Sequence, residues 1–407
     1  MKQPQSHRLK MVREKFKARV WPVVHRLAWP VVWLRRHLRP HKIHLTRVEG
    51  VVVGGNETLA ILCGATAQNK EYFLQLALQK VDQETDLGTV RLMDAFKPEY
   101  SRGKNAGLAV LETNQAMHQW LGDDGWFFIP AWLVGEIQVP LPEKALRSDT
   151  VRTIHRKIRK YGFEYEVTCE EARFKEYYDN MHVPYVTKEY GPTACLQSYA
   201  EMRTRCEAAG YALVLLRKKS QPDVIVAGGL VIYEPEKPRL WSFGVRDGNV
   251  ELVREGVLAA LYFFCFEHLA KQGFKLANMG GSRPFLRDGV LTFKKRISQS
   301  IVLGRWEGFA VRILELTPAT KAFLLNNPFF FVSRGRVHGA VFTEAPLTAK
   351  MVEELEHAFF YAGMNKLLLY FFQWDKNFRT ADLPPELAAR VEVRDAAEVV
   401  SGRLHLP

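Results

Sequence analysis

The chain has 407 residues, more than one compact domain usually contains, so two or three core-forming units are expected. Apolar residues make up 47% of it and charged residues 25%, which is the balance of a globular protein and excludes a disordered or fibrous chain. The five cysteines form no CxxC pair, which argues against a disulfide framework and against a zinc site, and favours a reducing compartment.

The first 41 residues are basic and aromatic. Residues 1–42 hold twelve lysines and arginines against one acid, Glu14, so this segment carries +11 of the net charge of +13. Trp21, Trp29 and Trp33 stand among apolar residues. The segment fits three interpretations: contact with an anionic membrane surface, binding of RNA such as tRNA, or a solvated tail. Pro22 and Pro30 oppose a continuous membrane-surface helix, and the tryptophans oppose a plain tail.

The sequence shows no signal peptide and no run of the roughly 18 apolar residues that a spanning helix needs. We therefore expect a cytoplasmic protein, with peripheral attachment to the inner face of the membrane as the expected role of residues 1–41. The sequence does not indicate an oligomeric state.

Residues 42–147 alternate strand-like and helical runs. Strands are expected at Gly50–Val53, Thr58–Cys63 and Thr89–Leu92, and a helix around Tyr72–Val81. The apolar run Trp126–Leu141 ends the region. This pattern predicts a first, small α/β unit.

Residues 148–316 have the most regular pattern. Ser148 is a suitable N-cap for a helix to Tyr161, and Gly162 is placed to end it. Further on, the expected elements are strands at Tyr211–Arg217, Val224–Tyr233 and Leu240–Val245, a helix at Val250–Gln272 and a strand at Phe274–Met279. Antiparallel strands before the long helix and a parallel step across it predict a mixed sheet with packed helices, which is an α/β (α+β) fold.

The long helix should bury one face against that sheet, formed by Val253, Val257, Leu261 and Phe264. Residues 317–407 are expected to form a small α/β C-terminal region.

The segment Gly280–Arg296, GGSRPFLRDGVLTFKKR, directly follows the last of these strands. Two glycines at a strand end permit close approach of a ligand or of another backbone segment. The expected binding residues are Gly280, Gly281, Ser282, Arg283, Lys294, Lys295 and Arg296, because hydroxyl and cationic groups suit a phosphate or carboxylate. A tight loop with a solvated basic turn is the simpler alternative.

Candidate acid or base residues are His182, Glu189, Tyr190 and Asp288, because an acceptor amine must lose a proton during acyl transfer. A lone histidine is more often structural, and Glu189 fits a plain loop charge equally well. Cys265 stands among phenylalanines and is expected in the core. No metal-binding motif is found, and His37, His41 and His44 are expected to be solvated residues.

The stretch Gly244–Arg296 resembles the second unit of FemAB-like and related acyltransferases of the GNAT superfold, including BioF2-like acetyltransferases. The resemblance lies in a strand, a helix, a strand ending in Gly-Gly-Ser, and a loop with Asp288-Gly289-Val290 and Phe293-Lys294. The helix Ser148–Tyr161 and the region Tyr177–Gly191 resemble the segments that precede this unit and shape its acceptor site. The match covers residues 148–305 and implies a GNAT-like acyltransferase domain at 148–316, with residues 42–147 as a reduced first GNAT unit.

The chain departs from acetyl-CoA-dependent relatives at one loop. Their R/Q-x-x-G-x-G/A segment holds the pyrophosphate at a helix N-terminus, whereas this chain reads Arg246–Val250 and then Arg254–Gly256. The resemblance therefore implies no tightly bound cofactor and leaves two co-substrates open, acyl-CoA and aminoacyl-tRNA.

Two functions follow from these expectations. The first is an acyl or aminoacyl transferase acting on a small-molecule, glycan or peptide precursor of the cell envelope or of a polysaccharide. The second is a catalytically inactive GNAT-fold module that binds a partner in envelope assembly. An open pocket between the strands Leu240–Val245 and Phe274–Met279 would favour the enzyme, and a filled one the module.

Overall fold

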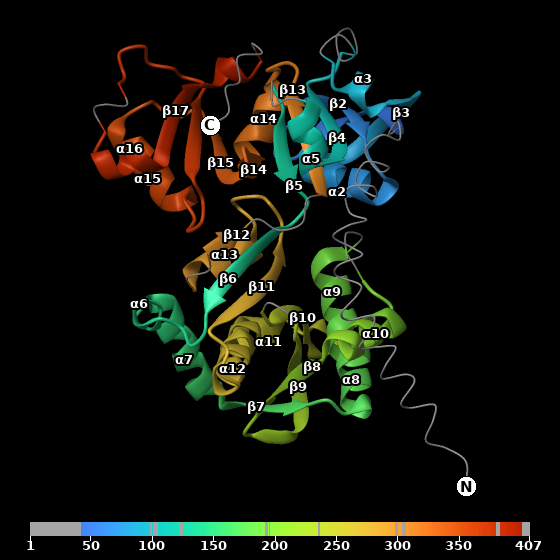
Figure 1. Cartoon of the computed structure of the whole chain (residues 1–407), viewed down its shortest axis with the longest axis vertical. Coiled ribbons are helices and arrows are strands. Elements are labelled where there is room, and N and C mark those ends of the chain that lie inside the picture. The colour runs from blue at the N-terminus through green and yellow to red at the C-terminus, as the bar shows by residue number, and fades with distance from the viewer. Residues whose placement is uncertain are drawn as a thin grey trace, which may run out of the picture.

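The computed structural model describes residues 42–97, 100, 105–121, 125–191, 194, 196–234, 237–297, 300–302, 307–379 and 383–400. Residues 1–41, which were interpreted above as a membrane-binding or RNA-binding segment, lie outside the described ranges. No helix in the described ranges combines the length and the apolar character needed to cross a membrane. The described strands form two mixed sheets, which lie one above the other in Figure 1.

The first sheet has ten strands in the described part of the chain. In spatial order they are β17 (Val391–Asp395), β16 (Lys366–Phe371), β15 (Arg336–Thr343), β14 (Phe329–Ser333), β5 (Phe127–Pro130), β13 (Glu307–Ile313), β4 (Leu108–Asn114), β2 (Thr58–Gly64), β1 (Lys42–Val52) and β3 (Leu78–Arg91). Parallel pairing joins β2 to β4 and β15 to β16 to β17, and the other neighbours are antiparallel. Residues Leu78–Val81, expected in a helix, form the start of β3.

The second sheet has seven described strands in the order β12 (Ser300–Val302), β6 (Leu133–Gln138), β11 (Leu276–Ser282), β10 (Arg239–Val245), β9 (Gln221–Ile232), β8 (Tyr211–Lys218) and β7 (Phe163–Thr168). The pair β10 and β11 is parallel and the others are antiparallel. The expected fold class, a mixed α/β sheet with packed helices, is confirmed.

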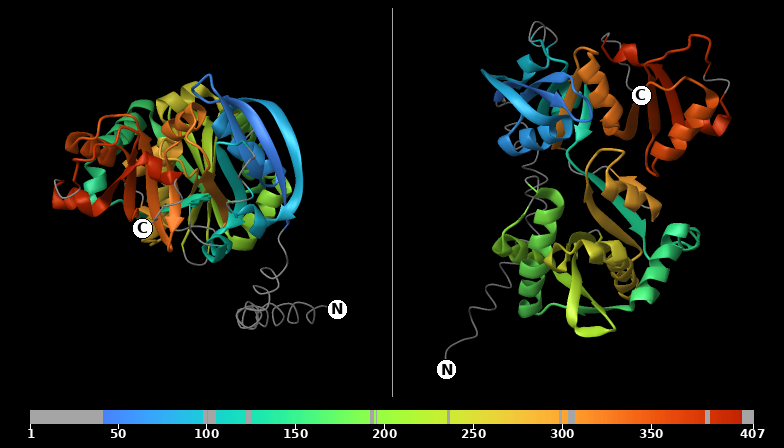
Figure 2. Two further views of the ribbon diagram at one scale, coloured as in Figure 1. Left: turned by 90° about the horizontal axis from the view of Figure 1, so that it is seen from above. Right: turned by 180° about the vertical axis from the view of Figure 1, so that it is seen from behind.

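Helices cover both faces of the second sheet (Figure 2). On one face lie α7 (Asp149–Tyr161) and α12 (Val257–Lys271). On the other lie α8 (Glu171–Tyr177), the π-helical turn η1 (Tyr178–His182) and α10 (Tyr199–Ala209). As predicted, α7 begins at Ser148, whose side chain accepts a hydrogen bond from the Val151 N–H at 3.2 Å, and ends at Gly162 in the left-handed conformation.

The long helix predicted over Val250–Gln272 is divided. Gly256 has a φ of +93°, which separates α11 (Val250–Glu255) from α12. Val257, Leu261 and Phe264 are buried as predicted. Val253 is only partly buried, because it belongs to the short helix before the break. Cys265 is buried in the same core, as expected, and burial raises the pKa of its thiol.

The two sheets do not follow the predicted domain boundaries. Strand β6, in the region expected to form the first unit, pairs with β11 and β12 of the second sheet, and Figure 1 shows it leaving β5 for that sheet. Strand β13, placed by prediction in the second domain, lies between β4 and β5 of the first. Four consecutive residues of β13 are buried, and such a strand needs neighbours on both edges and cover on both faces. The predicted units 42–147 and 148–316 are therefore interleaved.

The C-terminal region is α/β, as expected, but it extends the first sheet. Strand β14 pairs with β5 through Val332 and Phe128. The helices α14 (Pro318–Asn326) and α2 (Ala67–Ala77) share one core with β14 and β15. The helices α15 (Ala349–Phe359) and α16 (Pro385–Arg390) pack on the opposite face of the C-terminal strands.

Candidate functional site

The strands β10 and β11 separate at their carboxyl ends. They share one registered pair, Arg239 with Asn278, after which β11 continues alongside β6 through Gly281 and Ser282. Polar residues that follow strands in open α/β sheets meet at this edge. The segment Gly280–Arg296 begins there and leads into α13 (Gly289–Arg296).

Gly280 shows why glycine is needed at this strand end. Its φ is +72°, and a Cβ atom on it would lie 2.5 Å from the carbonyl oxygen of Leu240. Any larger residue would push β11 away from β10. Gly280 therefore serves close packing of backbone, one of the two roles that the sequence indicated, whereas Gly281 lies against the Trp132 side chain.

Lys294 is buried, contrary to the expectation of a partly exposed cation that binds an anion. Only 1% of its surface is exposed, and its Nζ donates to the Gly280 carbonyl at 3.3 Å, to the Gly281 carbonyl at 3.1 Å and to Ser282 Oγ at 2.9 Å. Burial lowers the pKa of Lys294 to about 7, against a smaller opposing influence of Asp288. Because these three acceptors surround Nζ, the side chain ties α13 to the end of β11.

Lys295 is engaged elsewhere, and Arg296 is exposed. The Lys295 Nζ donates to the carbonyls of His357 and Ala358, at 3.1 and 2.8 Å, at the end of α15, and lies 4.6 Å from the centre of the Tyr361 ring. Burial lowers the pKa of Lys295. The predicted cluster of three cations therefore does not form.

The C-terminal region holds the loop between β11 and α13 in place. The Leu286 N–H donates to the Pro328 carbonyl and the Phe330 N–H donates to the Pro284 carbonyl, both at 2.8 Å. The buried Tyr361 hydroxyl donates to the Leu286 carbonyl at 3.2 Å. The position of this loop is therefore set by β14 and by the chain after α15.

Three of the predicted residues influence the pKa of a fourth, Tyr190. Tyr190 ends α9 (Val183–Tyr190), and its pKa is raised by burial first and then by the carboxylates of Glu189 and Asp288, while Arg283 opposes the rise. Tyr190 is therefore a neutral O–H donor at neutral pH. The Asp288 carboxylate accepts the Leu291 N–H at 2.8 Å and caps α13, so it has a structural role. Glu189 is exposed and remains a candidate base.

His182 lies behind β10, inside the core. Its Nδ1 is 2.9 Å from Ser242 Oγ, which accepts a hydrogen bond from the Tyr177 hydroxyl at 2.9 Å. Burial lowers the pKa of His182. A Cβ atom on Gly244 would lie 2.5 Å from the His182 backbone nitrogen, so η1 packs directly on β10. His182 thus anchors the helical segment that leads into α9, which is the structural alternative stated for it.

Aromatic rings fill the core beside the opening between β10 and β11. The rings of Phe243 and Tyr262 stack with centroids 4.3 Å apart, and Tyr262 lies 5.4 Å from Phe293. Tyr185 and Tyr190 of α9 contribute to the raised pKa of Tyr262, after its burial. The aromatic side chains of α9 and α12 are therefore near one another at this edge.

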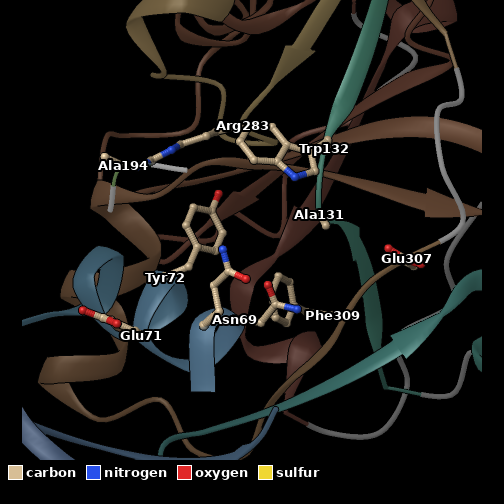
Figure 3. Close-up of a pocket in the computed structure, with 10 residues that line it drawn as sticks. Asn69, Glu71, Tyr72, Ala131, Trp132, Ala194, Arg283, Glu307 and Phe309 are labelled. Atoms are coloured by element: carbon tan, nitrogen blue, oxygen red, sulfur yellow. The ribbon is translucent and has the colours of Figure 1, made fainter. Parts of the chain in front are cut away.

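An open cavity lies next to this edge, where the two sheets meet. Its volume is about 300 Å³, and its lining residues are Gln68, Asn69, Glu71, Tyr72, Ala131, Trp132, Ala194, Arg283, Glu307 and Phe309. Figure 3 shows Tyr72 and Asn69 extending from α2 toward Arg283 and Trp132, with Glu71 and Glu307 on opposite sides. Of the predicted binding residues, Arg283 lines this cavity.

Sequence reasoning missed the residues that the first sheet and its connections contribute, above all Tyr72, Trp132 and Asn69. Trp132 comes two residues after Pro130, which ends the short strand β5. The available signal in the sequence was this proline, because it interrupts the apolar run and places Trp132 outside the strand. The α2 residues reach the cavity only because the two sheets pack together, and no local sequence pattern predicts that packing.

The helix N-terminus after β10 is already occupied. The Asn249 side chain accepts the N–H groups of Glu251 and Leu252, at 2.9 and 3.4 Å. These are the amides that an anion at the start of α11 would require. Among the described residues, no group of three or more His, Cys, Asp and Glu side chains is placed to hold a metal ion.

No family model and no curated protein matches the chain. Solved structures similar to it include a GCN5-related N-acetyltransferase from Sphaerobacter thermophilus, with 12% identity and a TM-score of 0.33 over 50% of this chain and 59% of that one. L-PGS from Bacillus licheniformis has 11% identity and a TM-score of 0.34 over 69% and 88% of the two chains. FemX has 11% identity and a TM-score of 0.34 over 66% and 84%.

Proposed function

We propose that the chain is an acyltransferase that moves an acyl or aminoacyl group to an amine or hydroxyl of a cell-envelope or polysaccharide precursor. The observation that carries the proposal is the parallel step β10–α12–β11, whose strands separate at their carboxyl ends beside a cavity lined by Arg283. This edge is where an α/β sheet places its ligands. The resemblance of Gly244–Arg296 to FemAB-like acyltransferases supports the same function.

Acyl transfer requires an acceptor that loses a proton and groups that stabilise the oxyanion. The exposed carboxylate of Glu189 is a candidate to take the proton, and Tyr190, whose pKa is raised, keeps its hydroxyl proton at neutral pH. Arg283 supplies a fixed positive charge at the cavity. Since Glu189 and Arg283 both influence the pKa of Tyr190, catalysis by positioning and electrostatics is the mechanism that fits these residues.

The acyl donor is acyl-CoA or aminoacyl-tRNA. The capping of α11 by Asn249 supports the second, because the amides that would cradle a pyrophosphate are already hydrogen-bonded. A GNAT-fold binding module without activity is the second candidate. The stacked rings of Phe243 and Tyr262 beside the strand opening support it, because they leave less room for a donor.

A ligand screen separates these functions. Acetyl-CoA, a longer acyl-CoA and an aminoacyl-tRNA are each added to the full chain, and thermal unfolding and product formation are measured. The true donor, at about 100 times its Kd, stabilises the fold by about 2.7 kcal/mol and raises Tm by a few degrees. Glu189→Gln should keep this shift and reduce the transfer rate. A shift without product for every donor and precursor tested would contradict the enzyme and favour the module.

The segment 1–41 should attach the protein reversibly to anionic membranes. Each cation near such a surface contributes about 1 kcal/mol, and the effect fades over roughly 8 Å at physiological salt. We expect the full chain to sediment with anionic vesicles but not with neutral ones, and a chain that starts at Lys42 to remain in solution. Equal sedimentation of both chains would show that the segment is not the anchor. Binding to tRNA instead of vesicles, with a steep salt dependence, would favour the RNA interpretation.

A further inference from the structure

One wall of the cavity between the sheets is an exposed indole ring, that of Trp132. Trp132 is 44% exposed and lines the cavity, whereas the nearby Trp126 is 2% exposed in the core. One side of the Trp132 ring rests on Gly281, where a Cβ atom would lie 3.1 Å from it. A flat apolar ring is thus supported from one side at the wall of the cavity.

The remaining lining groups suit a ligand with many hydroxyl groups. The Asn69 amide donates to the Glu112 carboxylate at 2.8 Å, which holds it in place at the cavity. Gln68 carries a second amide, and Glu71 and Glu307 carry acceptors. The Arg283 guanidinium, a donor, lies 5.0 Å from the centre of the Tyr72 ring. The lining holds two carboxylates and one guanidinium, so its charge favours a neutral or amine-bearing ligand over a phosphate.

We propose that this cavity is a saccharide subsite that holds one pyranose ring of the acceptor against Trp132. A pyranose ring presents polarised C–H groups on its face and hydroxyl groups at its edge. The face matches the negative π-surface of an indole, and the edge matches amides, carboxylates and a guanidinium. The inference rests on the proposed function, because it specifies the acceptor of that transfer, and amine-bearing sugars fit the two carboxylates best.

Binding is tested on the full chain by saturation-transfer NMR and calorimetry, with a glucosamine tetramer, a neutral glucose tetramer and adenosine 5′-monophosphate as probes. We expect the glucosamine tetramer to bind and Trp132→Ala to weaken its binding at least tenfold. Trp132→Phe should retain part of the affinity. The matched control is Trp120→Ala, which removes another exposed indole, 63% exposed and outside this cavity, and should leave Kd unchanged.

The proposal is overturned if neither sugar binds, if folded Trp132→Ala binds them as wild type does, or if adenosine 5′-monophosphate alone binds in a Trp132-dependent manner. Circular dichroism confirms the fold of each variant. The two proposals fail separately. Sugar binding that depends on Trp132, without acyl transfer from any donor, would contradict the proposed acyltransferase and support the saccharide subsite. Acyl transfer to an amine that carries no sugar, without any sugar binding, would support the acyltransferase and contradict the saccharide subsite.

Discussion

Replacing Lys294 with alanine is expected to lower the free energy of unfolding by about 3 kcal/mol, a typical cost for truncating a large buried side chain. The substitution leaves a hole beneath α13. It also leaves the Gly280 and Gly281 carbonyls and Ser282 Oγ without the donor that now satisfies them. Chemical denaturation of the two proteins measures the difference.

The matched control is Lys295→Ala on the same helix. Lys295 is only partly buried, and its two acceptors belong to the end of α15. We expect it to cost less than half as much as Lys294→Ala. An equal cost would mean that burial of Lys294 is not the source of the effect.

Lys294→Met separates the contribution of charge from that of volume. The ordinary lysine pKa is 10.5, and that of folded Lys294 is about 7, so the unfolded chain binds more protons between these values. The stability of the wild type relative to Lys294→Met should therefore rise as the pH increases from 7 to 10.5, by no more than about 5 kcal/mol. Below pH 7 both states are protonated and the difference should be constant. A flat difference across the whole range would contradict a buried lysine with a lowered pKa.

Removing residues 317–407 is expected to abolish cooperative folding, because these residues are part of the first sheet and its core. The deletion takes away β14, which lies beside β5, and many apolar residues of the core shared with α2 and β13. It also removes the Pro328 and Phe330 backbone groups that hold the loop before α13. Near-UV circular dichroism and thermal unfolding of the fragment 1–316 should show no fixed tertiary packing.

Phe331→Ala is the milder companion of this deletion. Phe331 is fully buried, and the centre of its ring lies 5.2 Å from the centre of the Phe127 ring in β5. We expect a folded protein destabilised by about 3–5 kcal/mol. A fragment 1–316 with a sharp unfolding transition would show that the first sheet does not depend on the C-terminal strands.

Much of the second sheet could be predicted because its signals are local. Ser148 and Gly162 mark the two ends of α7, and the alternation of strands around the long helix gives the mixed pairing. The assignment of β6 and β13 to sheets could not be predicted in this way. Both strands are short apolar runs that fit either sheet, and only long-range packing decides between them.

The candidate site shows the same limit. The sequence indicated correctly that Gly280–Arg296 follows a strand. Arg283, expected to bind an anion, lines the cavity beside it, and its binding role stays a prediction. It could not show that Lys294 turns inward, since a basic run in sequence does not report which side chain finds buried acceptors. It also could not supply Tyr72 and Trp132, which reach the cavity from the other sheet and from the connection between the sheets.

The interleaving of β13 has a consequence for how the protein is made. On the ribosome, β4 and β5 emerge long before their common neighbour, because Pro130 and Glu307 are separated by the whole second sheet. At typical rates of synthesis, the interval between these two residues is roughly 10–35 s. During this time β4 and β5 present unpaired edges to other nascent chains. Chaperones that cover these edges and a lower growth temperature should therefore raise the yield of folded protein.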